Sequence, residues 1–231
     1  SLENKGIAIT PYVNVWGTTP KEGWSQFFDS PRYSTGYTTL FNTLGLMVET
    51  HMLKPYKTRV AQTYQLLFSA LDFTEKNAVK IKELRANAVD EVLAQETYPI
   101  AFKVDAKNST ELQFKGYEGE YIDSKVTTGK RLFYDRSKPY TEPVKYYNNF
   151  VATKSVKIPK AYVLQQGWHK VLERLKNNKI EFSRFKNDTI IAVEVNHIDD
   201  FETSKTAYEG HYLHANTSVK TTKQNFKFRK G

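Results

Sequence analysis

Cysteine is absent from the 231 residues of the chain. This absence excludes disulfide bonds, thiolate metal sites and cysteine nucleophiles, so any metal ligand in the chain must be His, Asp or Glu. Long hydrophobic runs are absent as well, because no stretch approaches the roughly 20 apolar residues that cross a bilayer. Residues 1–10 also lack the basic and apolar stretches of a secretion signal. The sequence therefore predicts no membrane span and shows no secretion signal.

Several functional motifs are missing too. The sequence has no GxGxxG, no phosphate-binding loop and no GxSxG, so nucleotide binding and serine hydrolysis lack their usual residues. The 34 Lys and Arg outnumber the 25 Asp and Glu, but the basic residues are scattered along the chain. Scattered charge favours solubility more than a partner. In the run TTKQNFKFRKG, Lys alternates with Phe226 and Phe228, which favours an edge strand over a nucleic-acid surface. We expect no nucleic-acid partner.

The residues that are present predict a folded mixed protein. Hydrophobic residues make up 39% of the chain and aromatic residues 14%, which is enough for one large domain or two small ones. Before residue 95 the pattern reads as strand, helix, strand, helix. The predicted pieces are GIAITPYVNVW, TTLFNTLG closed by Gly45, the buried strand LMVET, and a long helical region after Pro55 with Val60, Tyr64, Leu67 and Leu71 on one face.

The pattern after Tyr98 changes to short β segments. These are YPIAFKV, ELQFKGY, NNFVATKSVKI, TIIAVEVNHI and QNFKFR. One predicted helix, GWHKVLERLKNN, interrupts them, and a strand over 180–185 is expected to follow it. The fold class predicted from the sequence is therefore α+β, with a division between residues 94 and 95.

Glu49 stands out because it follows the apolar run Leu46, Met47, Val48. Loss of water disfavours a charged carboxylate, so a carboxylate held at the end of a buried strand would need a functional reason to be there. The alternative is a Glu that faces solvent or pairs with Lys54 or Arg59. Spacing alone leaves both interpretations open, and it favours the second.

A family resemblance favours a functional role for Glu49. The stretch PRYSTGYTTLFNTLGLMVETHMLKPYKTRV, followed by an amphipathic helix, resembles the last part of the catalytic domain in zinc metallocarboxypeptidases of the carboxypeptidase A type. KIPKAYVLQQGWHKVLERLKNNKIEF and AYEGHYLHANTSV resemble the β-rich C-terminal extension found in a bacterial branch of this family. The resemblance implies that residues 1–94 are the C-terminal part of an incomplete α/β catalytic domain. It implies that residues 95–231 are an antiparallel β-rich accessory domain with one helix.

The resemblance also implies roles for individual residues. In this family zinc polarises the scissile carbonyl, while one glutamate takes a proton from water and passes it to the leaving amine. By resemblance Glu49 is that catalytic glutamate. Tyr33, with Tyr37 as second candidate, corresponds to a mobile tyrosine that hydrogen-bonds the peptide substrate. Arg32 is a candidate to bind a substrate carboxylate. An ordinary half-buried tyrosine and a surface arginine remain the alternatives for these positions.

The zinc ligands of the family are missing. Family members hold zinc through HxxE and a distant second His, but no HxxE occurs here and no His precedes Glu49. We therefore expect no metal ligand in this chain, zinc only in an intact parent protein, and no hydrolysis by the chain alone. We expect a portion cut from a longer enzyme or a natural partial homologue, which associates with itself or with the missing N-terminal part through an exposed strand edge. By resemblance alone, the location is extracytoplasmic, either periplasmic or secreted.

Two other interpretations remain open. The 15 Tyr and three Trp favour a β-rich module that binds carbohydrate or protein, or one with a purely structural role. His211 and His214, with Glu209 nearby, would share a metal only on a helical turn. If GHYLH is a strand, the two imidazoles point to opposite faces and do not chelate.

Overall fold

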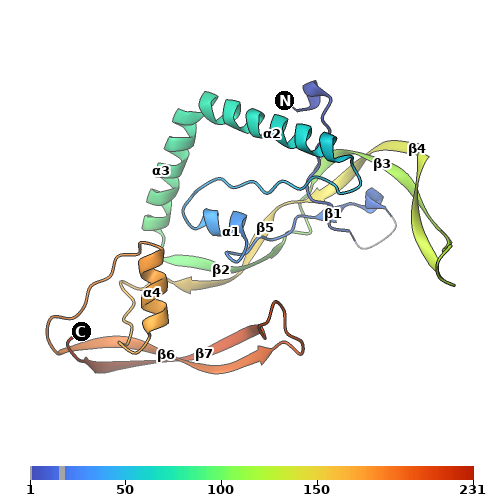
Figure 1. Cartoon of the computed structure of the whole chain (residues 1–231). Helices are drawn as coiled ribbons and strands as arrows, with labels where there is room; N and C mark the ends of the chain where they lie inside the picture. Colours follow the sequence, from blue (N-terminus) through green and yellow to red (C-terminus); the bar gives the residue numbers. More distant parts are fainter. Residues whose placement is uncertain (1, 16–18) are drawn as a thin grey trace. The chain divides into compact units, whose positions relative to one another are not determined.

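A computed structural model of the chain describes residues 2–15 and 19–231. Its described residues form four α-helices and seven β-strands, so the fold is mixed α+β (Figure 1). The residues group into two compact units, Ser1–Pro159 and Lys160–Gly231.

The elements of the first unit are the short 3-10 helices η1 (Glu3–Lys5) and η2 (Pro20–Glu22), strand β1 (Trp24–Ser25), helices α1 (Ser34–Thr39), α2 (Tyr56–Lys76) and α3 (Ala78–Ala94), and strands β2 (Thr97–Val104), β3 (Thr110–Asp123), β4 (Lys130–Tyr147) and β5 (Phe150–Lys157). The second unit contains α4 (His169–Asn177), β6 (Thr189–Thr203) and β7 (His214–Phe228).

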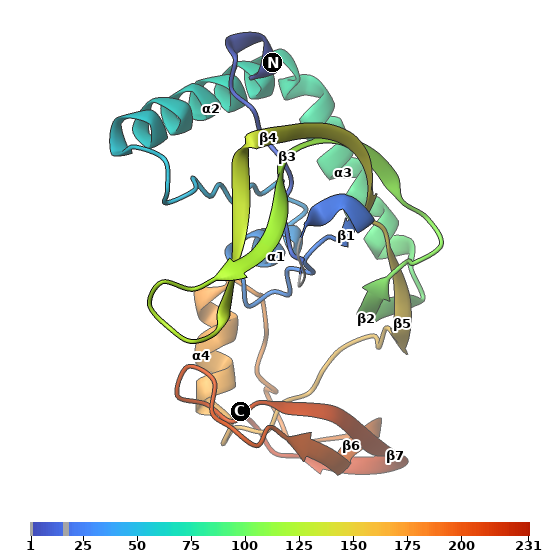
Figure 2. The ribbon, with the colours of Figure 1, turned by 90° about the vertical axis from the view of Figure 1, so that its right-hand side faces the viewer.

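The strands of the first unit form two nested antiparallel pairs. β3 and β4 run side by side in one long hairpin (Figure 2), and β2 pairs with β5 outside it. The two pairs meet at residues 105–109, where the Asp105 amide donates to the Asn149 carbonyl at 2.9 Å. Strand β1 adds a short parallel partner to β4, with Trp24 opposite Tyr146. The resulting sheet has the order β1-β4-β3.

The small core of this unit lies where β1 meets the hairpin. Trp24, Val144 and Tyr146 are buried and pack together, with Leu112 and Phe114 against them. The Trp24 ring lies 5.4 Å from that of Phe114, edge to face, and its indole N–H donates to the Tyr12 carbonyl. Apolar burial and satisfaction of the indole donor together hold β1 on the hairpin.

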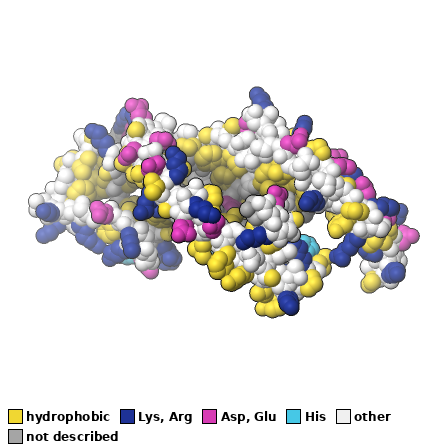
Figure 3. Space-filling view, turned by 90° about the horizontal axis from the view of Figure 1, so that it is seen from above, with side chains coloured by type: hydrophobic (Ala, Val, Ile, Leu, Met, Phe, Trp, Pro, Cys, Tyr) yellow, Lys and Arg dark blue, Asp and Glu magenta, His cyan; other side chains and the backbone are white. Residues whose placement is uncertain are grey.

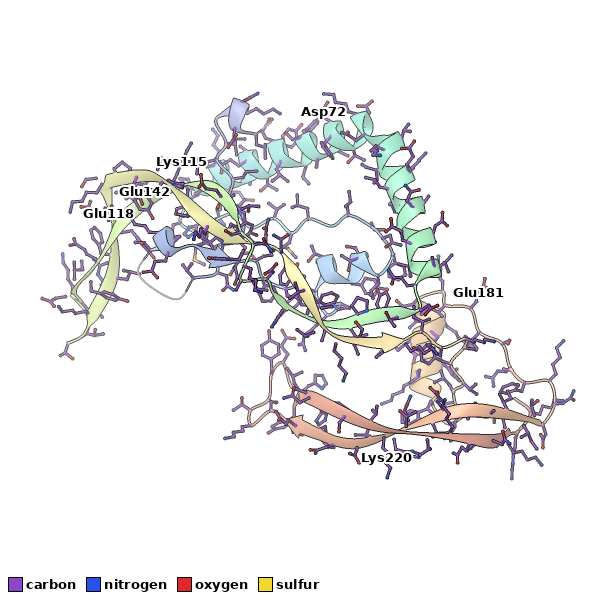
Figure 4. The ribbon with its side chains drawn as sticks, turned by 180° about the vertical axis from the view of Figure 1, so that it is seen from behind. Asp72, Lys115, Glu118, Glu142, Glu181 and Lys220 are labelled. Atoms are coloured by element: carbon purple, nitrogen blue, oxygen red, sulfur yellow. The ribbon has the colours of Figure 1, made fainter. Side chains whose placement is uncertain are left out.

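A lysine of η2 contacts both strands of the hairpin. Lys21 Nζ lies 2.7 Å from Glu118 and 3.5 Å from Glu142, which point from β3 and β4 (Figure 4), and 4.5 Å from the centre of the Tyr140 ring. The hydrogen bond to Glu118 is the main cause that raises the pKa of Lys21. Burial raises the pKa of Tyr140. These contacts position η2 and the chain that leads into β1.

Helices α2 and α3 expose their apolar faces. The two helices meet at Asn77, and neither contains a buried residue. Large apolar side chains of α2 are half exposed or more, namely Tyr56, Val60, Tyr64, Leu67, Phe68, Leu71 and Phe73. A space-filling view also shows hydrophobic side chains open to solvent (Figure 3). An amphipathic helix normally buries such a face, so α2 is a helix without its packing partner among the described residues.

In the second unit β6 and β7 form a two-stranded antiparallel ribbon, with Thr189 opposite Phe228 and Thr203 opposite His214. Phe185 stacks on Phe228 at 5.6 Å, which brings the chain after α4 against one end of the ribbon. The Gly231 amide donates to the Phe185 carbonyl at the same end.

Several predicted elements are confirmed. The helical region after Pro55 is α2 and α3, and the helix in GWHKVLERLKNN is α4. The five β segments predicted after Tyr98 each coincide with a strand, although two of them extend one or two residues beyond β5 and β7. The change from helical to β sequence pattern predicted near residue 95 coincides with the end of α3 and the start of β2. The division there into a catalytic and an accessory domain stays a prediction.

Other local predictions are wrong. Residues 6–15 form no strand, and Trp16 lies outside the described residues. The helix predicted in TTLFNTLG is α1, which lies earlier and ends at Thr39. LMVET and residues 180–185 form no strand, because neither segment has a neighbouring strand among the described residues to share a hydrogen-bond ladder.

Candidate functional site

The sequence YSTG forms the start of α1 around a closely packed glycine. Gly36 is buried, and a Cβ atom there would lie 2.2 Å from the Ser30 carbonyl oxygen and 2.3 Å from that of Asp29. Only glycine permits this approach of two backbone segments. The Asp29 carboxylate accepts a short hydrogen bond from the Thr35 hydroxyl. These contacts hold residues 29–36 in one local structure.

Two of the predicted substrate-binding residues have defined places in this structure. Tyr33 is the N-cap residue of α1, with extended backbone, and its ring meets that of Phe27 edge to face at 5.3 Å. Tyr37 lies within α1 and contacts the ring of Phe41 at 5.2 Å. The exposed fractions are 39% for Tyr33 and 42% for Tyr37. Both phenols are therefore held by ring packing while part of each side chain faces solvent.

Arg32 lies in the turn before Tyr33 and is exposed. The structure therefore brings Arg32, Tyr33 and Tyr37 together on or beside α1. Glu49 belongs to a different segment, the connection between α1 and α2.

The surroundings of Glu49 differ from the sequence prediction. Glu49 is exposed and lies in chain without helix or strand, so the predicted buried strand end is wrong for the described residues. The adjacent Val48 and Thr50 are half-buried, but the larger apolar side chains nearby are exposed. The large apolar side chains around it are Leu44 (77% exposed), Leu46 (72%), Met47 (59%), Met52 (80%) and Leu53 (72%). The described residues thus provide an apolar setting for Glu49 in sequence but do not enclose it in space.

The two basic residues considered as partners of Glu49 contact other groups. Lys54 Nζ donates to Gln62 Oε1 at 3.0 Å. The Arg59 guanidinium lies 5.6 Å from the centre of the Tyr56 ring. The first contact joins the turn before α2 to the helix, and the second lies within α2.

Sequence analysis missed one residue that positions this segment. Arg85 of α3 donates through Nε to the Asn42 carbonyl at 2.9 Å, and through a terminal nitrogen to Thr43 Oγ1 at 3.1 Å. The guanidinium therefore satisfies backbone acceptors just after α1. No local pattern could identify this contact, because the partners are far apart in the sequence.

A shallow apolar hollow lies on the surface of α2. Its lining residues are Tyr56, Lys57, Val60, Ala61, Tyr64 and Gln65, which all belong to this helix. A hollow formed by one face of one helix is open to solvent and cannot enclose a small ligand. It is instead the kind of surface on which another chain segment packs.

The residues do not supply a zinc site. Within residues 2–15 and 19–231, no group of three His, Cys, Asp or Glu side chains lies close enough to hold a metal ion, and this includes His211 and His214. The described residues therefore do not provide the donor set expected for zinc in the resembled family.

None of the helices in the described part of the chain has both the length and the apolar character needed to cross a membrane. Comparison of the chain with family models, with curated proteins and with solved structures finds no match.

Proposed function

We propose that the chain is the C-terminal part of a zinc-dependent metallocarboxypeptidase and contributes its general acid and base, Glu49. Residues 1–94 would belong to an incomplete α/β catalytic domain, and residues 95–231 would form a β-rich accessory domain that supports or shapes it. The resemblance of residues 31–60 to that family is the origin of the proposal.

The exposed apolar side chains around Glu49 are the structural observation that supports this proposal most strongly. Glu49 is surrounded in sequence by five large apolar side chains that are all more than half exposed. Exposure of such side chains is unfavourable by roughly 1.5 to 3 kcal/mol each relative to burial. A polypeptide that covers this segment would remove that cost and enclose Glu49 at the same time. The same covering polypeptide would therefore bury the exposed apolar side chains and give Glu49 the enclosed environment that we propose for it.

Helix α2 supports the same inference. Val60, Tyr64 and Leu67 recur at helical spacing and are exposed by 50%, 56% and 55%. They lie on the helix that directly follows the Glu49 segment. A single covering polypeptide that packs on α2 and on residues 44–53 would complete the catalytic domain, and we propose that the missing N-terminal part is this partner.

The proposed chemistry assigns one proton transfer to this chain. Glu49 would accept a proton from the attacking water and return it to the leaving amine of the peptide. The Tyr33 hydroxyl, or that of Tyr37, would donate a hydrogen bond to the substrate, and Arg32 would attract its carboxylate. Any zinc ligands would have to come from the covering polypeptide, because the described residues of this chain contain no group that could hold the metal. By resemblance the intact protein would act outside the cytoplasm.

The proposal is tested by comparing the 231-residue chain with the intact gene product. We expect the intact product to contain zinc and to remove C-terminal residues from peptides. The chain alone, even with added zinc, should do neither. Hydrolysis by the chain alone, or an intact product that binds no zinc, would contradict the proposal.

A second candidate function is carbohydrate binding by the β3–β4 hairpin. Tyr121 lies opposite Leu132, and Gly119 lies opposite Tyr134, so the two tyrosines share one face of the hairpin. Their exposed fractions are 58% and 46%. Exposed rings at neighbouring positions can stack on sugar rings, and Gly119 leaves space beside Tyr134.

This candidate is tested by calorimetric titration of the chain with a panel of soluble polysaccharides. Binding that is lost in a Tyr121→Ala, Tyr134→Ala double variant, but kept in Tyr162→Ala, would support it. Tyr162 is 80% exposed and lies outside the hairpin, which makes it a suitable control. Absence of heat with every polysaccharide would count against this function.

A further inference from the structure

The ribbon β6–β7 is a sheet of only two strands. Within the described residues, β6 pairs with β7 along its length and with no other strand (Figures 1 and 2). Its outer edge therefore presents backbone N–H and C=O groups that no neighbouring strand satisfies. Two-stranded ribbons are marginally stable in water, and three or more strands are usually needed. The ribbon has the features of a sheet that gains stability from another strand.

The two edges of the ribbon are protected differently. Strand β7 carries Lys220, Lys223 and Lys227, and Lys220 is labelled in Figure 4. Lysines on an edge strand oppose pairing with another chain. Strand β6 carries Asp199, Asp200 and Glu202 toward its end, but residues 189–198 contain only Glu194 and His197 as titratable residues. The Glu194 carboxylate lies 3.5 Å from Lys223 Nζ in the ribbon itself. The β6 edge is therefore the one that favours pairing.

We propose that β6 pairs antiparallel with β6 of a second copy of this chain, forming the four-stranded sheet β7-β6-β6-β7. The two-fold axis passes between the two Val193 residues. This contact is isologous, because the same edge is used by both copies. It involves only the second unit and does not depend on the carboxypeptidase proposal.

The alternation of side chains restricts the register. Ile191, Val193 and Val195 are half-buried and share one face with Phe226, which lies opposite Ile191. A shift of one residue would place this face beside the polar face of the second copy. The two-fold axis must therefore place one residue of β6 directly opposite the same residue of the second copy.

Charge and side-chain pairing then select one residue. An axis at Glu194 would place two like charges opposite each other, which is unfavourable. An axis at Val193 pairs Ile191 with Val195 of the second copy, pairs Val193 with itself, and places Glu194 opposite Ala192. This register keeps the apolar face continuous across both copies and separates the acidic residues.

Single cysteines test the contact cleanly, because the natural chain contains none. In the proposed sheet, Val193→Cys places two sulfurs across one strand pair, within reach of a disulfide. Gln224→Cys is the matched control, since Gln224 lies opposite Val193 on β7. Three strand spacings would separate the two copies of that residue by about 14 Å, beyond the reach of a disulfide.

We expect the unmodified chain to sediment as a dimer, and mild oxidation to cross-link the Val193→Cys chain several-fold more than the Gln224→Cys chain. A mixture of Ala192→Cys and Glu194→Cys chains should cross-link more than either chain alone, because these positions face each other. A monomeric unmodified chain would overturn the proposal. Equal cross-linking of the Val193→Cys and Gln224→Cys chains would overturn it as well, even if a dimer forms through another surface.

Discussion

Gly36 determines the local structure that holds Tyr33 and Tyr37. Because a Cβ atom at Gly36 would approach backbone oxygens of Asp29 and Ser30, Gly36→Ala must displace one of the two segments. We expect this variant to lose about 1 to 3 kcal/mol of local stability. Hydrogen exchange of the Tyr37 amide, which donates to the Tyr33 carbonyl, measures the effect.

The matched control for Gly36 is Gly129→Ala. The nearest atom to a Cβ at Gly129 is Thr127 Oγ1 at 3.7 Å, an ordinary contact. This variant should leave the exchange of the Tyr37 amide unchanged. Unaltered exchange in Gly36→Ala would show that residues 29–36 are not packed as described.

Asp105 provides a prediction about pH. The side-chain hydrogen bond from Asn108 is the main cause that lowers the pKa of Asp105 below its ordinary value of 3.8, and the Lys107 amide adds to it. A carboxyl whose pKa is lower in the folded chain contributes stability above its unfolded pKa, and this contribution is lost as pH falls through the folded pKa. The stabilisation of the β2–β3 junction should therefore persist at neutral pH and disappear in acid.

An Asn108→Ala variant isolates this interaction. NMR titration of the Asp105 carboxyl should show its pKa rising toward 3.8 in the variant. Asp135, whose pKa is lowered mainly by the Ser137 hydroxyl, serves as the internal control and should not change. An Asp105 pKa that is the same in both proteins would rule out the hydrogen bond as its cause.

At the scale of elements, the attachment of β1 to the hairpin depends on a few buried side chains. Val144 of β4 is 2% exposed, whereas Val126, in the turn between β3 and β4, is 92% exposed. At about 0.8 kcal/mol per buried CH₂, Val144→Ala should cost about 2 kcal/mol of unfolding free energy and Val126→Ala almost nothing. Denaturant titration of the two variants checks this. Equal midpoints would contradict the position of the core.

Helix α2 is expected to behave differently in two settings. Leu67 is 55% exposed, so Leu67→Ala should change the stability of the 231-residue chain by less than about 0.5 kcal/mol. If another polypeptide covers α2 in the intact gene product, the same change there should cost about 2 to 5 kcal/mol. Thermal unfolding of both proteins gives the comparison. A neutral effect in both settings would mean that α2 remains exposed.

The elements that the sequence predicts correctly are those with a local pattern. Val171, Leu172 and Leu175 repeat at helical spacing in α4, and Ile191, Val193 and Val195 alternate in β6, so short stretches are sufficient to identify them. The charges of the flanking residues are not needed to identify α4 and β6 from the sequence.

The predictions that failed depended on distant parts of the chain. LMVET looks like a buried strand because it is apolar, but a strand requires a neighbour that the sequence pattern does not reveal. Gly45 predicts the end of the first helix, but α1 lies earlier, where Gly36 packs closely against the backbone of Asp29. The contact of Arg85 with Asn42 is equally invisible, since it joins α3 to the turn after α1.

Across the whole molecule, each unit has one surface that the proposals above use. The β6 edge lacks the lysines that protect β7, while α2 and residues 44–53 expose apolar side chains. The proposed occupants differ: a second copy of the chain for the β6 edge, and a covering polypeptide for α2 and residues 44–53. They are separable, because cysteine cross-linking on β6 and peptide hydrolysis measure different surfaces.

If Glu49 transfers a proton in peptide hydrolysis once it is covered, as we propose, turnover must depend on its carboxylate. The most direct test is the rate of C-terminal residue release by the intact gene product with Glu49→Gln, and with Glu75→Gln on α2 as the matched control. We expect Glu49→Gln to lower kcat by at least about 100-fold with zinc content unchanged, and Glu75→Gln to have little effect. Hydrolysis at the unaltered rate by the Glu49→Gln protein would show that Glu49 is not the group that transfers the proton.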